Sequence, residues 1–168
     1  MSQPLYALSL FVHILSTLIW IGGLWLTILL VWPELRRALE NKDAFYQLLS
    51  RWRKRFFAVS NLCLVALIAT GLFQMTADPY YNGFIQFDND WSKVMLAKHG
   101  LIVLMAIAGL VLQFIVVPSL ERQSILLQKD GNNKTEWQRL RRQEIILTWL
   151  SAILGFFVVG LSVWAATL

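Results

Sequence analysis

Two histidines and a lysine lie within apolar stretches of this chain, where ionisable side chains are rare. Lys98 and His99 are adjacent in the segment SKVMLAKHGL, and His13, the only other histidine, lies in the apolar run near the N-terminus. Neutral imidazole is the commonest metal ligand in proteins, and ionisable groups in hydrocarbon are costly and often functional. The two histidines are therefore the first candidates for chemistry, as ligands of one metal or metal cofactor.

Four long apolar runs must position these side chains. They predict helices over residues 5–32, 56–77, 92–118 and 142–167, within a single domain of residues 1–168. Each run is long enough to cross about 30 Å of hydrocarbon as a helix. Charged residues make up only 15% of the chain, which argues against a soluble enzyme, because soluble domains have roughly 25%. The sequence predicts an all-α integral membrane four-helix bundle.

Basic residues are distributed unequally among the segments that connect these helices. The first and third connecting segments are rich in arginine and lysine, whereas segment 77–92 has three aspartates and no basic residue. The positive-inside rule then predicts that both basic segments are cytoplasmic, with segment 77–92 and both termini outside, in a bacterial inner membrane. Apolar residues at near-helical spacing in 34–55 predict an amphipathic helix on the cytoplasmic surface. The net charge of +5 is thus a topology signal, and the expected partner is the lipid bilayer rather than nucleic acid.

Small and polar residues recur at spacings of three and four along each expected helix. Such a stripe lets helices approach one another away from lipid. The four stripes are His13, Ser16, Trp20, Gly23 and Thr27; Ser60, Cys63, Leu67, Thr70 and Gln74; Ser92, Met95, His99, Ile102, Ala106, Gly109 and Gln113; and Thr148, Ser151, Gly155, Val158 and Ser162. Both histidines lie on a stripe, at depths of roughly 12 and 10 Å from the outer surface. Lys98 should point about 100° away from His99.

Haem b is the cofactor that this arrangement predicts first. Two histidines from different helices at one level suit the axial positions of a haem iron in a bundle. In this interpretation Trp20 and Gly23 flank the flat macrocycle, and Lys98 and Lys93 pair with its propionates. The two imidazoles would be the ligands of the iron.

Copper is the alternative, with a thioether joining His13 and His99. Met95 lies one helical turn from His99, and Met75 ends the second expected helix on the outer side. Soft sulfur together with imidazole suits Cu(I). A third interpretation contains no metal: the histidines form hydrogen bonds between helices, and Lys98 extends its ammonium group to the outer interface.

Four segments carry a resemblance to a known family. They are FVHILSTLIWIGGLW, RWRKRFFAVSNLCLVALIATGLF, VMLAKHGLIVLMAIAGLVLQ and LRRQEIILTWLSAILG. These segments resemble the four helices of copper resistance D (CopD) domain proteins. The resemblance implies a membrane protein that handles copper, often beside a periplasmic copper-binding partner. The same pattern is similar to that of J-type protoporphyrinogen oxidases, which implies His13 and Lys98 as haem ligands. The additional His99 favours a bis-histidine site instead.

The leading interpretation is a haem b protein that transfers electrons to a quinone or to a partner subunit. The alternatives are a copper transport or copper-resistance protein, a protoporphyrinogen oxidase-like enzyme, and a cofactor-free accessory subunit of a membrane complex. A homo-oligomer is compatible with each of them. They differ in whether His99, Lys98 or a methionine joins His13.

Overall fold

The computed structural model describes residues 3–38, 42–81, 83, 89–130 and 134–168, and in these residues it contains helices and no strands. The elements are α1 (Gln3–Leu26), the π-helical turn η1 (Thr27–Val31), α2 (Trp32–Ala38), α3 (Lys42–Ala77), α4 (Asp90–Val111), the π-helical turn η2 (Leu112–Val116), α5 (Val117–Asp130) and α6 (Lys134–Ala165). Within the described part of the chain, four helical stretches are long and apolar enough to span a membrane: Gln3–Glu34, Gln47–Ala77, Asp90–Leu126 and Thr135–Ala165. The predicted all-α, four-span fold is confirmed.

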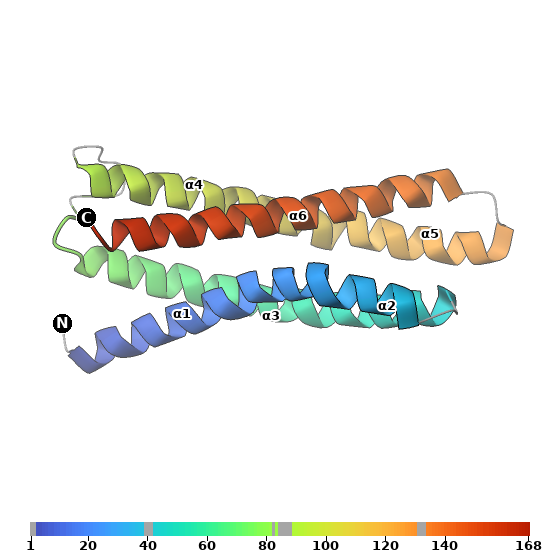
Figure 1. Ribbon diagram of the computed structural model, residues 1–168, viewed down its shortest axis with the longest axis horizontal. Helices are drawn as coiled ribbons and strands as arrows, with labels where there is room; N and C mark the ends of the chain where they lie inside the picture. Colours follow the sequence, from blue (N-terminus) through green and yellow to red (C-terminus); the bar gives the residue numbers. More distant parts are fainter. Residues whose placement is uncertain (1–2, 39–41, 82, 84–88, 131–133) are drawn as a thin grey trace.

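The helices form two antiparallel pairs that lie side by side (Figure 1). α1 packs against α3, α4 packs against α6, and contacts between α1 and α6 join the two pairs. Among the described residues, α3 and α4 do not pack closely against each other. Both chain ends lie at the end of the bundle where α3 finishes and α4 begins, and the basic segments lie at the opposite end. This common placement is what the predicted orientation requires.

The inward faces of the helices coincide with the four stripes that the sequence predicts. Every residue of those stripes is buried or half-buried. The central core contains Ile21, Leu24, Met105 and Ala152, whereas long apolar side chains cover the outside of the bundle. Examples are Phe11, Leu62, Phe114 and Phe156, each more than 60% exposed. A surface of this kind is suited to lipid, which is as apolar as the side chains that meet it.

Each π-helical turn precedes a proline by two residues. Proline lacks the backbone N–H and its ring clashes with the carbonyl four residues earlier, so an α-helical turn cannot continue unchanged. Before Pro33 the helix widens at η1, where the Trp32 N–H bonds to the Thr27 carbonyl oxygen. Before Pro118 it widens at η2, where the Val117 N–H bonds to the Leu112 carbonyl oxygen. Both spans remain continuous helices through these wide turns.

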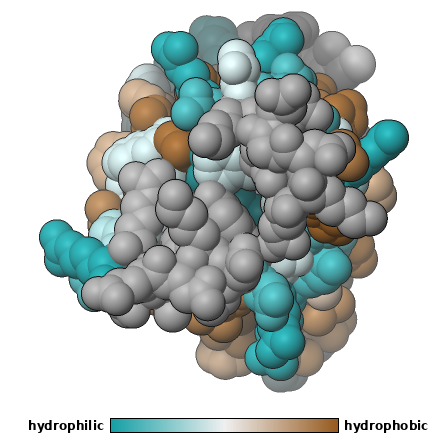
Figure 2. All heavy atoms as spheres, turned by 90° about the vertical axis from the view of Figure 1, so that its right-hand side faces the viewer, coloured by the Kyte–Doolittle hydropathy of each residue, from teal (hydrophilic) through white to brown (hydrophobic). Residues whose placement is uncertain are grey.

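The helices at the basic end are longer than predicted. α3 begins at Lys42 rather than near residue 56, and α6 begins at Lys134 rather than near residue 142. The described part of the expected surface helix 34–55 is therefore divided between α2 and the first turns of α3. The physical reason is that this part of α3 packs against the bundle: Leu49 is fully buried, and the Trp52 indole donates to the Thr27 hydroxyl at 3.2 Å. Hydrophilic side chains project at several points around this end of the molecule, with hydrophobic side chains between them (Figure 2).

Candidate functional site

His13 is held by α3 through one ring nitrogen. Its Nδ1 lies 2.8 Å from the Thr70 hydroxyl oxygen, and that hydroxyl already donates its hydrogen to the Ala66 carbonyl oxygen at 2.6 Å. The Thr70 oxygen must therefore accept, and His13 Nδ1 must donate. The neutral ring then carries its free lone pair on Nε2, which is the atom that could bind a metal.

His99 is oriented in the same way, but by its own helix. Its Nδ1 lies 2.6 Å from the Met95 carbonyl oxygen. A carbonyl oxygen can only accept, so Nδ1 carries the hydrogen and Nε2 is again available. Metal-binding histidines almost always have this arrangement, in which the second nitrogen donates to an oxygen that orients the ring. Both histidines are thus prepared as ligands in the same tautomer.

The two methionines that the sequence predicts as copper ligands lie in one hydrophobic cluster near the aspartate-rich end of the bundle. Met75 is buried in a cluster with Trp91, Val94 and Ala165, and Met95 packs against this cluster. On α4, His99 is one turn further into the bundle, about 6 Å from Met95 along the helix axis. The thioethers therefore lie at the aspartate-rich end of the bundle, and the His99 imidazole lies one helical turn deeper.

His13 lies at nearly the same depth along the bundle as His99. Its partner Thr70 lies five residues before Met75 on α3, which is about 7 Å deeper, and the ring packs beside Gly71, where an added Cβ would lie 3.4 Å from His13 Cε1. His13 and His99 therefore both lie about one turn below the methionines. They come from α1 and α4, which are not a closely packed pair among the described residues.

Lys98 is half-buried on α4 and lies near enough to His13 for their charges to interact. Its expected direction, about 100° away from His99 around the helix, stays a prediction. Lys93, the other expected propionate partner, is exposed and forms an ion pair with Asp90 at 2.8 Å.

Trp20 and Gly23, which the haem interpretation places beside the macrocycle, lie deeper than the histidines. They are about 10 and 15 Å from His13 along α1. Trp20 lines a separate cavity, and Gly23 provides close packing, since a Cβ there would lie 2.5 Å from Phe56 Cε2. In the described residues, no three side chains of His, Cys, Asp or Glu gather as a metal site. A three-ligand site at the histidines would therefore need methionine sulfur or lysine nitrogen.

Most of the chain matches a known protein family. The model of the family described as copper resistance protein D matches residues 50–165. This chain belongs to the copper resistance protein D family. The matched region contains Met75, Met95, Lys98 and His99, whereas His13 precedes it. No curated protein and no solved structure gives a match.

The family region also contains a buried ion-pair cluster that sequence reasoning missed. Glu144 is paired with Arg53 through two hydrogen bonds of 2.6 and 2.8 Å, and Arg141 pairs with the same carboxylate. The Arg141 guanidinium also stacks on Trp32, 5.0 Å from the ring centroid. The signal in the sequence is a glutamate and two arginines at the ends of apolar helices, but arginines at these positions also fit the positive-inside rule, which hides their pairing.

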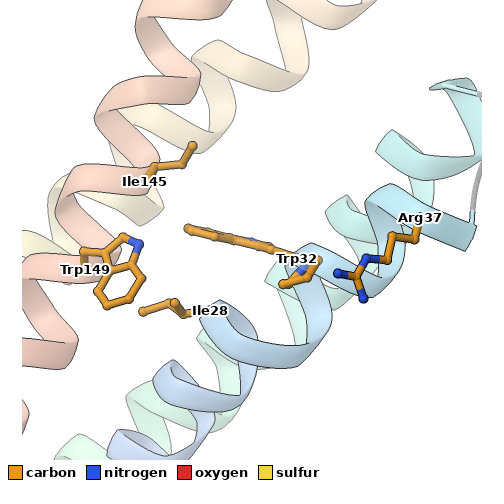
Figure 3. A pocket seen from close by; sticks show the side chains of 6 residues that line it. Ile28, Trp32, Arg37, Ile145 and Trp149 are labelled. Atoms are coloured by element: carbon orange, nitrogen blue, oxygen red, sulfur yellow. The ribbon is translucent and has the colours of Figure 1, made fainter.

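Two hollows flank this cluster. One is a cavity of about 90 Å³ between the helix pairs, lined by Arg53, Glu144 and residues of α1, α3, α4 and α6. The other is an open groove of about 390 Å³ (Figure 3), where Ile28, Trp32 and Arg37 face Ile145 and Trp149 of α6. Trp32 lines both and therefore separates them.

Proposed function

We propose that this protein is a copper-resistance membrane protein that binds copper(I) as its cargo at the aspartate-rich end of the bundle. The observation that supports this most directly is the grouping of two thioethers, from Met75 and Met95, one turn from an imidazole whose Nε2 is free to coordinate. Membership of the copper resistance protein D family supports the same cargo.

The chemistry of these groups suits the copper(I) ion. Thioether sulfur is a soft ligand that selects copper(I), and imidazole also binds it. Each ligand is neutral, so binding neither releases a proton from a thiol nor requires a carboxylate. Under the predicted orientation, this region faces the outside of the inner membrane, and copper would reach the methionines before the histidines.

The test is a copper(I) titration of the purified protein in detergent, under reducing conditions, against a chromophoric copper(I) chelator. Met75→Leu and Met95→Leu keep the apolar volume and remove the sulfur, and His99→Ala removes the imidazole. Each variant should weaken copper(I) binding by at least about tenfold, or about 1.4 kcal/mol. Met105→Leu is the matched control, because Met105 lies in the central core away from this cluster.

Three results would contradict the proposal. One is stoichiometric copper(I) binding that none of the Met75, Met95 and His99 substitutions changes. A second is an equal loss in Met105→Leu, which would indicate a general effect of the substitution on folding. A protein without copper(I) affinity in the competition assay would also remove copper as cargo.

Haem b is a second candidate, supported by the matching tautomers of the two histidines. If haem binds, His13 and His99 would hold its iron through Nε2, and it would supply one-electron transfer, with a quinone or a partner subunit as the acceptor. Its test is the visible spectrum of protein purified from haem-replete cells. A reducible b-type spectrum should disappear in both His13→Ala and His99→Ala, and a colourless protein would exclude this candidate. A spectrum that persists in His99→Ala but is lost in Lys98→Ala would indicate His13 and Lys98 as the ligands.

A further inference from the structure

The cavity between the two helix pairs has both aromatic and hydroxyl walls. Trp20, Trp52 and Phe56 contribute rings from α1 and α3, whereas Ser60 of α3 and Ser151 of α6 contribute hydroxyls. The two serines lie near the midpoints of the spans Gln47–Ala77 and Thr135–Ala165. Polar groups at this depth face hydrocarbon rather than water, so their partners must come from the protein or from a ligand.

The hydroxyls of these two serines lack partners in the described structure. Ser60 is 8% exposed and Ser151 is 4% exposed, and neither Oγ has a hydrogen bond. Three other hydroxyls on these helices, those of Thr70, Thr148 and Ser162, donate to the carbonyl oxygen four residues earlier. Ser60 and Ser151 do not, so their hydrogens are available to an acceptor inside the cavity.

The cavity is bounded differently toward water and toward lipid. At the basic end, Arg53 and Glu144 pair with each other, and Arg141 lies over the Trp32 ring. On the side between α3 and the span that contains α4, η2 and α5, Asn61 Nδ2 donates to Gln113 Oε1 of η2 at 3.2 Å. Nearer the basic end, Phe57 of α3 packs against the cluster of Leu112, Val116 and Leu120.

Residues on this side are open to the bilayer. Asn61 and Leu110 line the cavity and are exposed, and α3 and α4 are not closely packed among the described residues. At Gly109, also in the lining, an added Cβ would meet no described atom within 4 Å. A ligand that enters here must therefore dissolve in lipid.

We propose that this cavity binds the ring of a lipid-soluble quinone. A quinone offers a carbonyl oxygen, whose two lone pairs can accept from both the Ser60 and the Ser151 hydroxyl, and a flat apolar ring for the aromatic walls. An acyl chain would leave both hydroxyls unsatisfied, at a cost in free energy. The cavity of about 90 Å³ holds one edge of the ring with its oxygen, and the rest lies in the opening between α3 and α4. The site uses none of the proposed copper ligands, so it is tested independently.

The experiment measures binding of decylubiquinone to the purified protein in phosphatidylcholine nanodiscs, by quenching of tryptophan fluorescence. Gly109→Leu places a side chain in the open space at the cavity and should weaken binding at least tenfold. Gly160→Leu is the matched control, because Gly160 is exposed on α6 and its added Cβ also meets no described atom within 4 Å. The double variant Ser60→Ala, Ser151→Ala removes the donors without adding volume and should weaken binding about tenfold, from the loss of two hydrogen bonds.

Saturable quenching in the wild type and in Gly160→Leu, weakened in the other two variants, would support the quinone site. Equal quenching in all four proteins would show that decylubiquinone only partitions into the lipid, and would overturn the proposal. Quenching that Gly109→Leu abolishes but the serine variant leaves unchanged would also overturn it, since the cavity would then accept an apolar chain without recognising the quinone oxygen. The serine variant adds no bulk, so it remains informative if Gly109→Leu does not fold.

Discussion

Glu144 is the residue that balances charge at the basic end of the bundle. Its side chain is 5% exposed, and the side chains of its two partners, Arg53 and Arg141, are 12% and 8% exposed. A buried carboxylate between two guanidinium groups leaves the cluster with a net charge of +1. Removing one member of a buried ion pair is costly because the remaining charge has lost its partner.

Glu144→Gln should therefore destabilise the protein strongly. The neutral amide leaves two buried guanidinium groups without the carboxylate to which both are bonded. We expect a loss of about 3–5 kcal/mol in the free energy of unfolding. The single cysteine of the chain, Cys63, is buried, so its reaction with a thiol-sensitive dye during heating reports unfolding in detergent. Glu136→Gln on the same helix is the control, since Glu136 is exposed.

A second variant separates charge from packing. Arg53→Met together with Glu144→Met removes the bidentate pair but keeps the net charge of the cluster at +1, carried by Arg141 on the Trp32 ring. Its melting temperature should lie above that of Glu144→Gln alone. A melting temperature equal to the wild type in Glu144→Gln would show that the carboxylate is not needed to balance the two arginines.

At the scale of the elements, α1 and α3 make a very close contact at Gly23. An added Cβ at Gly23 would lie 2.5 Å from Phe56 Cε2, which is closer than side-chain atoms can approach. The neighbouring Gly22 lies on another side of α1, where an added Cβ meets no atom of the described chain within 4 Å. The two glycines therefore differ in tertiary role, although they are adjacent in sequence.

Gly23→Ala should destabilise the α1–α3 pair, whereas Gly22→Ala should not. We expect a loss of about 1–3 kcal/mol at Gly23, because the Phe56 ring must move out of its packed position. At Gly22 the better helix propensity of alanine should be neutral or stabilise by up to about 1 kcal/mol. Thermal unfolding of both variants checks this. Adding Phe56→Leu to Gly23→Ala should recover part of the loss, and no recovery would mean that the strain lies elsewhere.

The two wide helical turns contribute residues to the cavity between the helix pairs. η1 precedes Pro33 and η2 precedes Pro118, and Thr27 of η1 and Gln113 of η2 both line the cavity. π-helical turns occur frequently at functional sites. The two prolines thus shape the part of α1 and α4 that faces the proposed quinone ring.

At the scale of the whole molecule, the two ends of the bundle have different chemistry. The methionines and histidines lie toward the end with both termini, and the arginine–glutamate cluster lies toward the opposite end, with the basic segments (Figure 1). Under the positive-inside rule the first end faces outward. Copper binding and quinone binding would then occur at different depths of one bundle.

Cysteine labelling in intact cells tests this orientation. Tyr80→Cys, at an exposed position after α3, should react with a membrane-impermeant maleimide added outside. Arg139→Cys, exposed near the start of α6, should react only after the membrane is permeabilised. The wild-type chain is the control, because its buried Cys63 should stay unlabelled in both conditions. The opposite labelling pattern would invert the predicted topology.

The sequence by itself determined the four helical spans, their inward faces and the placement of both basic segments at one end. These features are local: hydropathy indicates a span, and spacings of three and four indicate which face is buried. The stripes at His13 and His99 were predictable for the same reason. Haem as cofactor, the surface position of 34–55 and the sidedness of the bundle remain predictions.

Only the tertiary structure decided which groups meet across helices. Thr70 as the partner of His13 requires the rotation of α3 against α1, and the pairing of Arg53 with Glu144 joins residues 91 positions apart. The unpartnered hydroxyls of Ser60 and Ser151 depend on packing on both sides of a cavity. Periodicity in one chain assigns a residue to a helix face, but the neighbour opposite that face is set by how the four helices pack together.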